Sequence, residues 1–326
     1  MTTVKDAVAV PANKKFVFNL RDFGIVFGLI AIMLFLAINT TTFMTARNFI
    51  NLFDQAAIIG LLGAGATLCI ISGVFDLSST ASLAVSAIVG VRITQEFGVV
   101  AGFFGALIAG LLLGSITGLI VVVTKVNSFI GTLAISIIYR GLAIVMTGGA
   151  IVAPLPDQML SFQVWTWPSI FNLTAGSVLM IAVMLVLGII LWRTTFGRRV
   201  YAVGGNQEAA RLSGIRTGFI HVAVFAISGL CSGMAGMILA SRAGSAQPSM
   251  AIGLELTAIA AVIIGGTSIL GGQGAVWRTL VGVMILTVIG NGFNLLHWDT
   301  MYQQVVTGVL ILVAVAVDGL FLRGRG

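Results

Sequence analysis

Residues 173–192 read LTAGSVLMIAVMLVLGIILW, and residues 193–218 read RTTFGRRVYAVGGNQEAARLSGIRTG. The first stretch is apolar and long enough to cross a bilayer as a helix that rises about 1.5 Å per residue. The second stretch carries five arginines and a single glutamate, and another apolar run follows it. This alternation predicts a helical membrane protein. A polar loop with this much charge is expected to meet a soluble partner.

The composition supports the same class of protein. The chain is 58% hydrophobic and 8% charged, whereas soluble domains carry about 25% charged residues. We therefore predict an all-α polytopic membrane protein surrounded by lipid. The net charge of +7 comes from short basic segments beside apolar runs, which indicates membrane orientation rather than nucleic-acid binding. Cys69 and Cys231 lie in apolar runs, where free thiols are expected and a metal site is not.

Apolar runs of about 20 residues predict about ten membrane spans. The predicted spans are 22–40, 55–74, 79–95, 99–124, 128–147, 173–192, 219–241, 254–272, 276–296 and 302–321. The first is interpreted as an uncleaved membrane helix rather than a signal peptide, because no clear cleavage site follows it. The third is interrupted by serines and the eighth ends in glycines, so either could be broken or re-entrant, around residues 72–80 and 265–274. The pairs Gly114/Gly118 and Gly229/Gly233 have the spacing that lets helices pack closely.

The lysines and arginines predict the orientation of these spans. We expect one transmembrane domain over residues 22–321, with cytoplasmic tails at 1–21 and 322–326. The predicted cytoplasmic positive charges are Lys5, Lys14, Lys15, Arg21, Lys125, Arg278, Arg323, Arg325 and the arginines of 193–218. The outside receives Arg47, Arg92, Arg242 and the segment 148–172, which contains no lysine or arginine.

The outer segment 148–172 combines prolines with aromatic side chains. Pro154, Pro156 and Pro168 preclude a continuous helix. Trp165 and Trp167 favour the headgroup level of a bilayer. The segment is interpreted as an interfacial lid: an aromatic belt, a substrate contact, or a docking surface for an outside partner.

Residues 206–214 of the polar loop have the pattern of a short capped helix. Asn206 suits the N-cap, Glu208 suits the positive N-terminal end, and Arg211 suits the C-terminal end. Gly214 can adopt the left-handed conformation that ends a helix. Two turns are too few to be stable alone, so the helix is expected to pack on a partner.

The other residues of this segment fit a docking role. Gly204 and Gly205 are expected to free the entry to the helix. A small, flat apolar contact surface is expected from Ala209, Ala210 and Leu212, and Ser213 belongs to the same predicted coupling segment. An ordinary ordered loop explains the same pattern equally well.

Several separated motifs resemble one transporter family. GGN-x-EAARLSGI at 204–215 and TTFGR at 194–198 resemble the coupling motif of permease subunits from bacterial ATP-binding-cassette importers for monosaccharides, of the ribose/arabinose/xylose type. SGVFDLS at 72–78 resembles the family's Ser-Gly-Gly-Ile-Asp-Leu-Ser. The likeness runs from about residue 55 to the end and includes motifs within 245–274 and 291–296. Val74-Phe75 and Ser79-Thr80 depart from the family's usual residues, which weakens inference about the turn after Asp76.

The resemblance implies partners for the chain. Members of the family pair as homodimers or as dimers of similar chains in the bacterial inner membrane, dock a cytoplasmic ATPase on their coupling helices, and receive sugar from a soluble binding protein. The sequence contains no Gly-x-x-x-x-Gly-Lys-Ser/Thr motif, so ATP must be bound by another polypeptide. No cofactor or metal is expected in this chain. A pentose is the first guess for the substrate, and other monosaccharides and polyols remain open.

Ionisable residues at membrane depth are functional candidates because they are costly there. Asp76, expected near the cytoplasmic face, is interpreted either as the N-cap of the third span or as part of a gate. Arg140 and Glu255 are hypothesised to form an ion pair that holds the outer side. His221 and His297 are expected at the two membrane faces.

Three uncharged polar residues near helix ends complete the predicted translocation path: Gln247, Asn291 and Asn294. Their side chains suit a passage for hydroxyl-rich solutes, but interhelical hydrogen bonding explains them equally well. A self-sufficient secondary transporter is the alternative function, although it would normally show an inverted repeat and a coupling-ion site. A membrane-embedded enzyme is less favoured, because the sequence shows no catalytic constellation.

Overall fold

The computed structural model describes residues 20–299, 301–303, 305–309 and 312. The secondary structure of these residues is helical, apart from two isolated β-bridges. The long helices are α1 (Leu20–Asn39), α2 (Ala46–Ile71), α3 (Ser79–Phe97), α4 (Val99–Thr124), α5 (Ser128–Thr147), α7 (Ala175–Arg193), α10 (Thr217–Ala243) and α12 (Val276–Leu295). The shorter elements are η1 (Pro156–Gln158), α6 (Met159–Phe162), η2 (Gln163–Thr166), η3 (Ile170–Asn172), α8 (Thr195–Gly205), α9 (Gln207–Leu212) and α11 (Leu254–Ile264).

Six of the described helices are long and apolar enough to cross a membrane: α2, α4, α5, α7, α10 and α12. Shorter apolar helices cover Gly24–Asn39 and α11. The all-α membrane class is therefore confirmed. The predicted tenth span, 302–321, falls largely outside the described residues.

Two predicted spans have wrong boundaries. The second begins at Ala46, nine residues before the predicted start, because Thr45 caps the helix by accepting a hydrogen bond from the Asn48 amide. The eighth stops at Ile264 instead of Gly272. Gly266, Gly271 and Gly272 all have positive φ angles, so glycines convert the predicted end of this span into an irregular loop.

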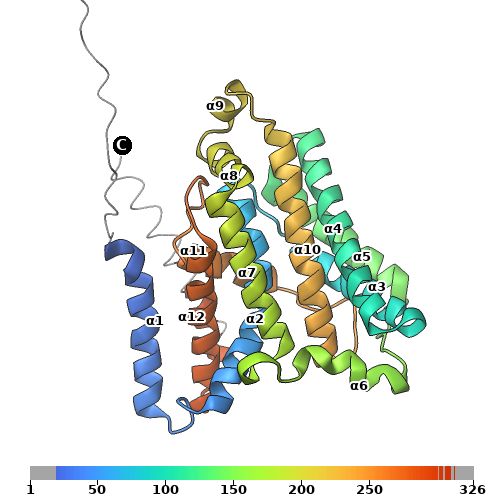
Figure 1. The fold of residues 1–326 in the computed structure, drawn as a ribbon, viewed down its shortest axis with the longest axis vertical. Coiled ribbons are helices and arrows are strands. Elements are labelled where there is room, and N and C mark those ends of the chain that lie inside the picture. The colour runs from blue at the N-terminus through green and yellow to red at the C-terminus, as the bar shows by residue number, and fades with distance from the viewer. Residues whose placement is uncertain (1–19, 300, 304, 310–311, 313–326) are drawn as a thin grey trace, which may run out of the picture.

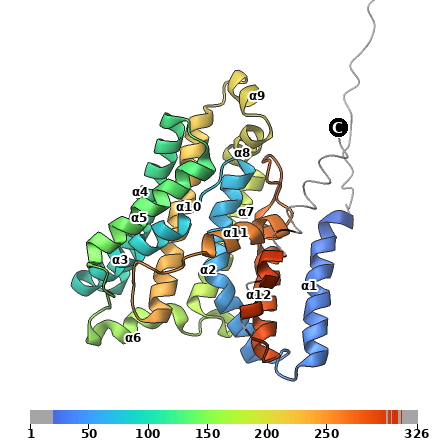
Figure 2. The same ribbon diagram turned by 180° about the vertical axis from the view of Figure 1, so that it is seen from behind.

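The helices surround α2, and the two predicted loops lie at opposite ends of the bundle. In α2, 83% of the residues in the most apolar stretch are buried, against 22% in α5, so α2 is central and α5 is peripheral. Figure 1 shows α8 and α9 at one end and α6 at the other. From behind, α11 is seen at mid-height in the bundle (Figure 2). It packs against α2 and α12.

Glycines bring α4 and α10 into backbone contact. A Cβ atom added to Gly114 would lie 2.2 Å from the carbonyl oxygen of Phe225. One added to Gly229 would lie 2.1 Å from the carbonyl oxygen of Gly110. The close packing predicted from the glycine spacing is confirmed, and it fixes α4 against α10 along several turns.

We expect Gly114→Ala to destabilise the protein, because the added methyl group must push α4 away from the α10 backbone. Overpacking of this kind costs about 1–3 kcal/mol. The midpoint temperature of unfolding in detergent should fall. Gly141→Ala is the matched control, because a Cβ there meets nothing within 4 Å. Equal unfolding temperatures for the two variants would contradict the close contact.

Candidate functional site

The polar loop contains the predicted capped helix. It is α9, Gln207–Leu212. The Asn206 Oδ1 accepts a hydrogen bond of 2.9 Å from the Ala209 amide. The Arg211 guanidinium donates to both carboxylate oxygens of Glu208, at 2.6 and 3.1 Å. These bonds lower the pKa of Glu208. Gly214 has a φ of 82°, as a left-handed helix end requires.

The surface of α9 is divided between the protein and solvent. Ala210 is buried against the rest of the chain, whereas Ala209 is exposed. Leu212 is 78% exposed. The Ser213 hydroxyl turns back and donates to the Ala209 carbonyl. Of the predicted apolar contacts, Ala209 and Leu212 are therefore available to a partner and Ala210 is not.

Gly204 lies where three separate segments meet. A Cβ added to Gly204 would be 1.7 Å from the Ile71 carbonyl oxygen and 2.7 Å from the Gly272 nitrogen. The Gly272 amide itself donates to the Ile71 carbonyl, at 2.8 Å. We call Ile71, Gly204 and Gly272 the glycine junction. It connects the end of α2, the end of α8 and the loop after α11.

The predicted reason for the two glycines needs correction. Gly204 and Gly205 do not free the entry to α9, because both belong to α8. Gly204 is required by the close approach of Ile71, whereas a Cβ on Gly205 would meet nothing within 4 Å. The Tyr201 hydroxyl adds a second tie between α8 and the loop by donating to the Gly274 carbonyl, at 2.7 Å.

A hollow of about 440 Å³ opens beside the C-terminal end of α9. We call it the basic hollow, because two arginines line it. Its lining residues are Arg199, Ser213, Gly214, Ile215, Arg216, Phe219 and Ile220. It joins the exposed surface of α9 to the start of α10.

Asp76 lies inside the bundle, on the irregular segment 72–78 between α2 and α3. Its side chain accepts from the Ser78 amide and hydroxyl, at 2.9 and 2.6 Å, and from the Ser228 hydroxyl, at 2.6 Å. Ser228 lies about 16 Å along α10 from its start at Thr217. The amides on either side of Asp76, those of Phe75 and Leu77, donate to Ser128 and Thr132 in the first turns of α5, so the predicted position of Asp76 near the cytoplasmic face stays a prediction. Asp76 is not the N-cap of α3, because Ser78 occupies that position.

The described residues include no direct ion pair between Arg140 and Glu255, although the two charges lie close enough for Glu255 to act on Arg140. The Arg140 Nη1 donates to the carbonyls of Pro248 and Met250, at 2.6 and 2.7 Å. The Glu255 Oε2 accepts from the Thr80 hydroxyl, at 2.6 Å. Arg140 therefore ties α5 to the segment before α11, and Glu255, at the start of α11, ties that helix to Thr80 of α3. An arginine can donate its hydrogen bonds either to backbone carbonyls or to a carboxylate. Sequence spacing does not show which of these two acceptors it binds.

The other predicted path residues are dispersed. Asn291 is buried and exchanges two amide hydrogen bonds with Asn48, at 2.8 and 3.2 Å, which join α12 to α2. Gln247 and Asn294 are exposed on separate segments. The structure therefore does not bring the predicted path residues together in one cavity. His221 lies about one turn from the start of α10 and is buried, with its Nε2 3.2 Å from the Ser72 carbonyl. His297 is exposed.

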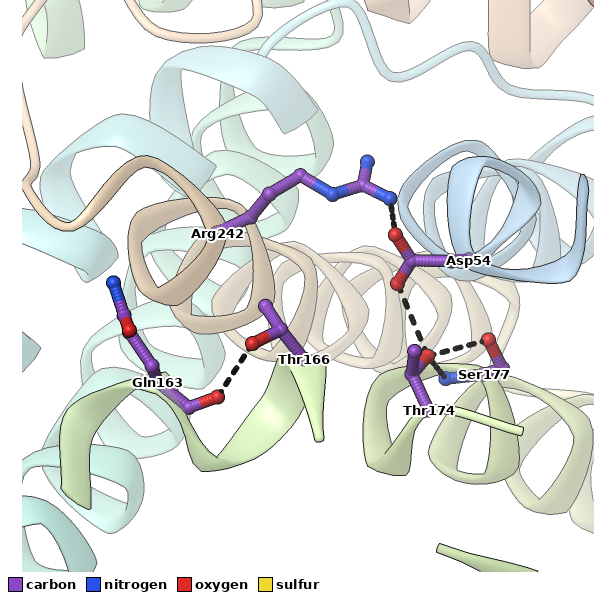
Figure 3. Close-up of polar contacts among 6 residues, drawn as sticks. All are labelled: Asp54, Gln163, Thr166, Thr174, Ser177 and Arg242. Atoms are coloured by element: carbon purple, nitrogen blue, oxygen red, sulfur yellow. Dashed lines mark hydrogen bonds and ion pairs between the residues drawn. The ribbon is translucent and has the colours of Figure 1, made fainter. Parts of the chain in front are cut away.

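An ion pair that the sequence reading missed joins three helices at the end of the bundle opposite α9. Arg242 of α10 pairs with Asp54 of α2, and Thr174 donates to the other Asp54 oxygen, at 3.0 Å (Figure 3). Thr174 also caps α7 by accepting from the Ser177 amide. We call Asp54, Arg242 and Thr174 the outer clamp. The predicted second span began at residue 55, so Asp54 fell outside it, whereas the structure places Asp54 one-third of the way into α2.

The segment 148–172 packs on the bundle next to this clamp. Phe162 is fully buried, and its carbonyl accepts from the Ser241 hydroxyl of α10, at 2.7 Å. Trp165 stacks on Phe103 of α4 with a centroid separation of 4.5 Å. Trp167 is 41% exposed. The predicted membrane-facing position therefore suits Trp167, whereas Trp165 is a packing residue.

Known proteins resemble this chain over nearly its whole length. Residues 48–315 match the family model described as "Branched-chain amino acid transport system / permease component". The chain belongs to this permease family. It is a multi-pass membrane subunit of a transport system and not an enzyme.

Three curated relatives illustrate the similarity. The chain is 38% identical over 300 residues to a ribose import permease protein of Bacillus subtilis, covering 92% of this chain and 93% of the relative. It is 35% identical over 297 residues to the D-allose transport system permease protein of Escherichia coli, covering 90% of each. It is 35% identical to the xylose transport system permease protein of Escherichia coli over an alignment 363 positions long, gaps included, which covers 92% of each chain.

We expect Asp54→Asn to lower the free energy of unfolding, because Arg242 loses its carboxylate inside a partly buried site. The expected loss is about 1–3 kcal/mol, between the values for exposed and buried pairs. Thermal unfolding in detergent measures it. Arg92→Gln is the control, since Arg92 makes only a long 3.4 Å bond to the Met146 carbonyl. An Asp54→Asn variant as stable as the control would contradict the clamp.

Proposed function

We propose that this chain is the membrane-spanning permease subunit of an ATP-binding-cassette importer for a monosaccharide, with a pentose as the first substrate to test. The observation that carries the proposal is the capped helix α9, which lies at one end of a membrane bundle with Leu212 uncovered. A two-turn helix needs a partner surface to remain folded. The relatives named for ribose, allose and xylose support a sugar as the cargo.

The charge distribution supports a cytoplasmic position for α9. Five arginines lie in 193–218 and none in 148–172, and these segments lie at opposite ends of the bundle (Figure 1). Under the positive-inside rule the arginine-rich end faces the cytoplasm. Both termini then lie on the cytoplasmic side of a bacterial inner membrane, with about ten spans between them.

Three partners follow from this role. A separate ATPase supplies the energy, because the sequence lacks a phosphate-binding loop of its own. A soluble sugar-binding protein meets the outer end, where 148–172 lies. A second copy of the chain completes a homodimer.

The glycine junction gives α9 a direct mechanical connection to the bundle. Movement of α9 reaches α8, whose end rests against the Ile71 carbonyl and the Gly272 amide. Ile71 ends α2 and leads into residues 72–78, where Asp76 is bonded to α10. In this role, residues 204–214 transmit closure of the ATPase to the segments that alternate access.

The proposed function is tested by purifying the tagged full-length chain from its native host. An ATPase subunit should co-purify with it, and proteoliposomes that contain both, supplied with the binding protein, should take up ribose or xylose only when ATP is present. Uptake by the purified chain alone would contradict the proposal and support a secondary transporter.

We expect Gly204→Ala to reduce coupling without preventing ATPase binding. The added methyl group would displace the junction from the Ile71 carbonyl, at a cost of about 1–3 kcal/mol. Sugar uptake per ATP hydrolysed should therefore fall. Gly205→Ala is a matched control on the same helix, because it adds the same methyl group in open space. The transmission role would be refuted by equal uptake per ATP in the two variants.

A further inference from the structure

The polar loop contains guanidinium groups that its own acidic residue does not neutralise. Glu208 is the one acidic residue of 193–218, and both of its oxygens accept from Arg211. Arg199 and Arg216 are exposed and form no ion pair within the described part of the chain. Both line the basic hollow. The hollow therefore carries two positive charges that are available to an external anion.

The walls of the hollow combine these charges with apolar surface. Ile215 and Phe219 contribute apolar side chains, and Phe219 is 66% exposed. Arginine beside exposed aromatic surface is the combination enriched at the centres of protein interfaces. The start of α10 lies at the same place, and the positive end of a helix dipole adds to the attraction for an anion.

The position of the hollow indicates whether a soluble protein or a lipid headgroup binds there. Ser213, which directly follows the exposed Leu212, is one of the hollow's lining residues, so the leucine lies beside the hollow. Figure 1 shows α9 projecting beyond the neighbouring ends of α8 and α10. A soluble protein that covers Leu212 must also cover the hollow, whereas a lipid headgroup would leave Leu212 in water.

We propose that the basic hollow receives an acidic side chain of the ATPase subunit, held between Arg199 and Arg216 while Leu212 packs on an apolar patch beside it. This inference rests on the proposed function and adds the chemistry of the contact. Guanidinium groups bind carboxylates through two parallel hydrogen bonds. The contact therefore sets the orientation of the ATPase on α9, and its strength depends on ionic strength.

The test compares reversed charges inside and outside the hollow. Full-length Arg199→Glu/Arg216→Glu permease is immobilised in nanodiscs of phosphatidylcholine, and binding of the ATPase is measured over a series of salt concentrations. The control is Arg198→Glu, an exposed arginine of the same helix that does not line the hollow. We expect the double variant to bind the ATPase about tenfold more weakly or worse, and Arg198→Glu to bind as the wild type does.

A compensating change makes the test specific. One acidic residue of the ATPase surface, changed to arginine, should restore binding to the double variant and weaken binding to the wild type. Equal ATPase binding by the wild type and the double variant would overturn this inference and leave the proposed function intact. An effect of the double variant that appears only when phosphatidylglycerol is added would identify a lipid phosphate as the occupant and overturn it too. Failure of the wild-type chain to bind any ATPase would instead refute the proposed function.

Discussion

Backbone groups inside a bilayer must find hydrogen-bond partners within the protein, and this chain interrupts its helical bundle with two irregular segments, after α2 and after α11. After α2, the amides of Phe75 and Leu77 are satisfied by the hydroxyls of Ser128 and Thr132 on α5, each at 3.0 Å. After α11, the Gly272 amide is satisfied by the Ile71 carbonyl. The first interruption thus takes its partners from α5, and the second takes one from the last residue of α2. Because each segment depends on a neighbouring helix, a displacement of that helix requires the segment to adjust.

The pair α2 and α10 is fastened at several depths. The outer clamp joins them through Asp54 and Arg242. Deeper in the bundle, Ser228 donates to Asp76 just beyond α2, and the Cys69 thiol donates to the Val224 carbonyl, at 3.7 Å. These contacts lie along most of both helices. These contacts favour a mechanism of alternating access in which α2 and α10 move together as one unit. A mechanism in which the two helices slide past each other would break the contacts.

The features predicted correctly from sequence are those with local causes. The helix α9 has its cap, its charge pattern and its terminal glycine within nine residues, and each signal acts over one turn. The pairs Gly114/Gly118 and Gly229/Gly233 likewise indicated that each of their helices can be approached closely, although not which helix approaches which. In both cases the residues that determine the structure are neighbours along a single helix.

The features that sequence reasoning missed depend on contacts between distant segments. Asp76 resembled a helix cap because serines follow it, but its second oxygen is taken by Ser228, about 150 residues away. Arg140 and Glu255 have opposite charges, yet backbone carbonyls and a threonine hydroxyl occupy them. The role of Gly204 depends on Ile71 and Gly272, which belong to two other parts of the chain. Periodicity and capping rules carry no information about such partners.

The burial of both cysteines has a practical consequence for observing this protein at work. Cys69 and Cys231 are at most 1% exposed, and neither forms a disulfide. Thiolate reactivity requires access to solvent, so the native thiols should remain unlabelled by maleimide reagents. A single cysteine placed at the exposed position of Leu212 would then carry a fluorescent or spin label alone. The motion of the short cytoplasmic helix can thus be followed spectroscopically in the otherwise natural sequence.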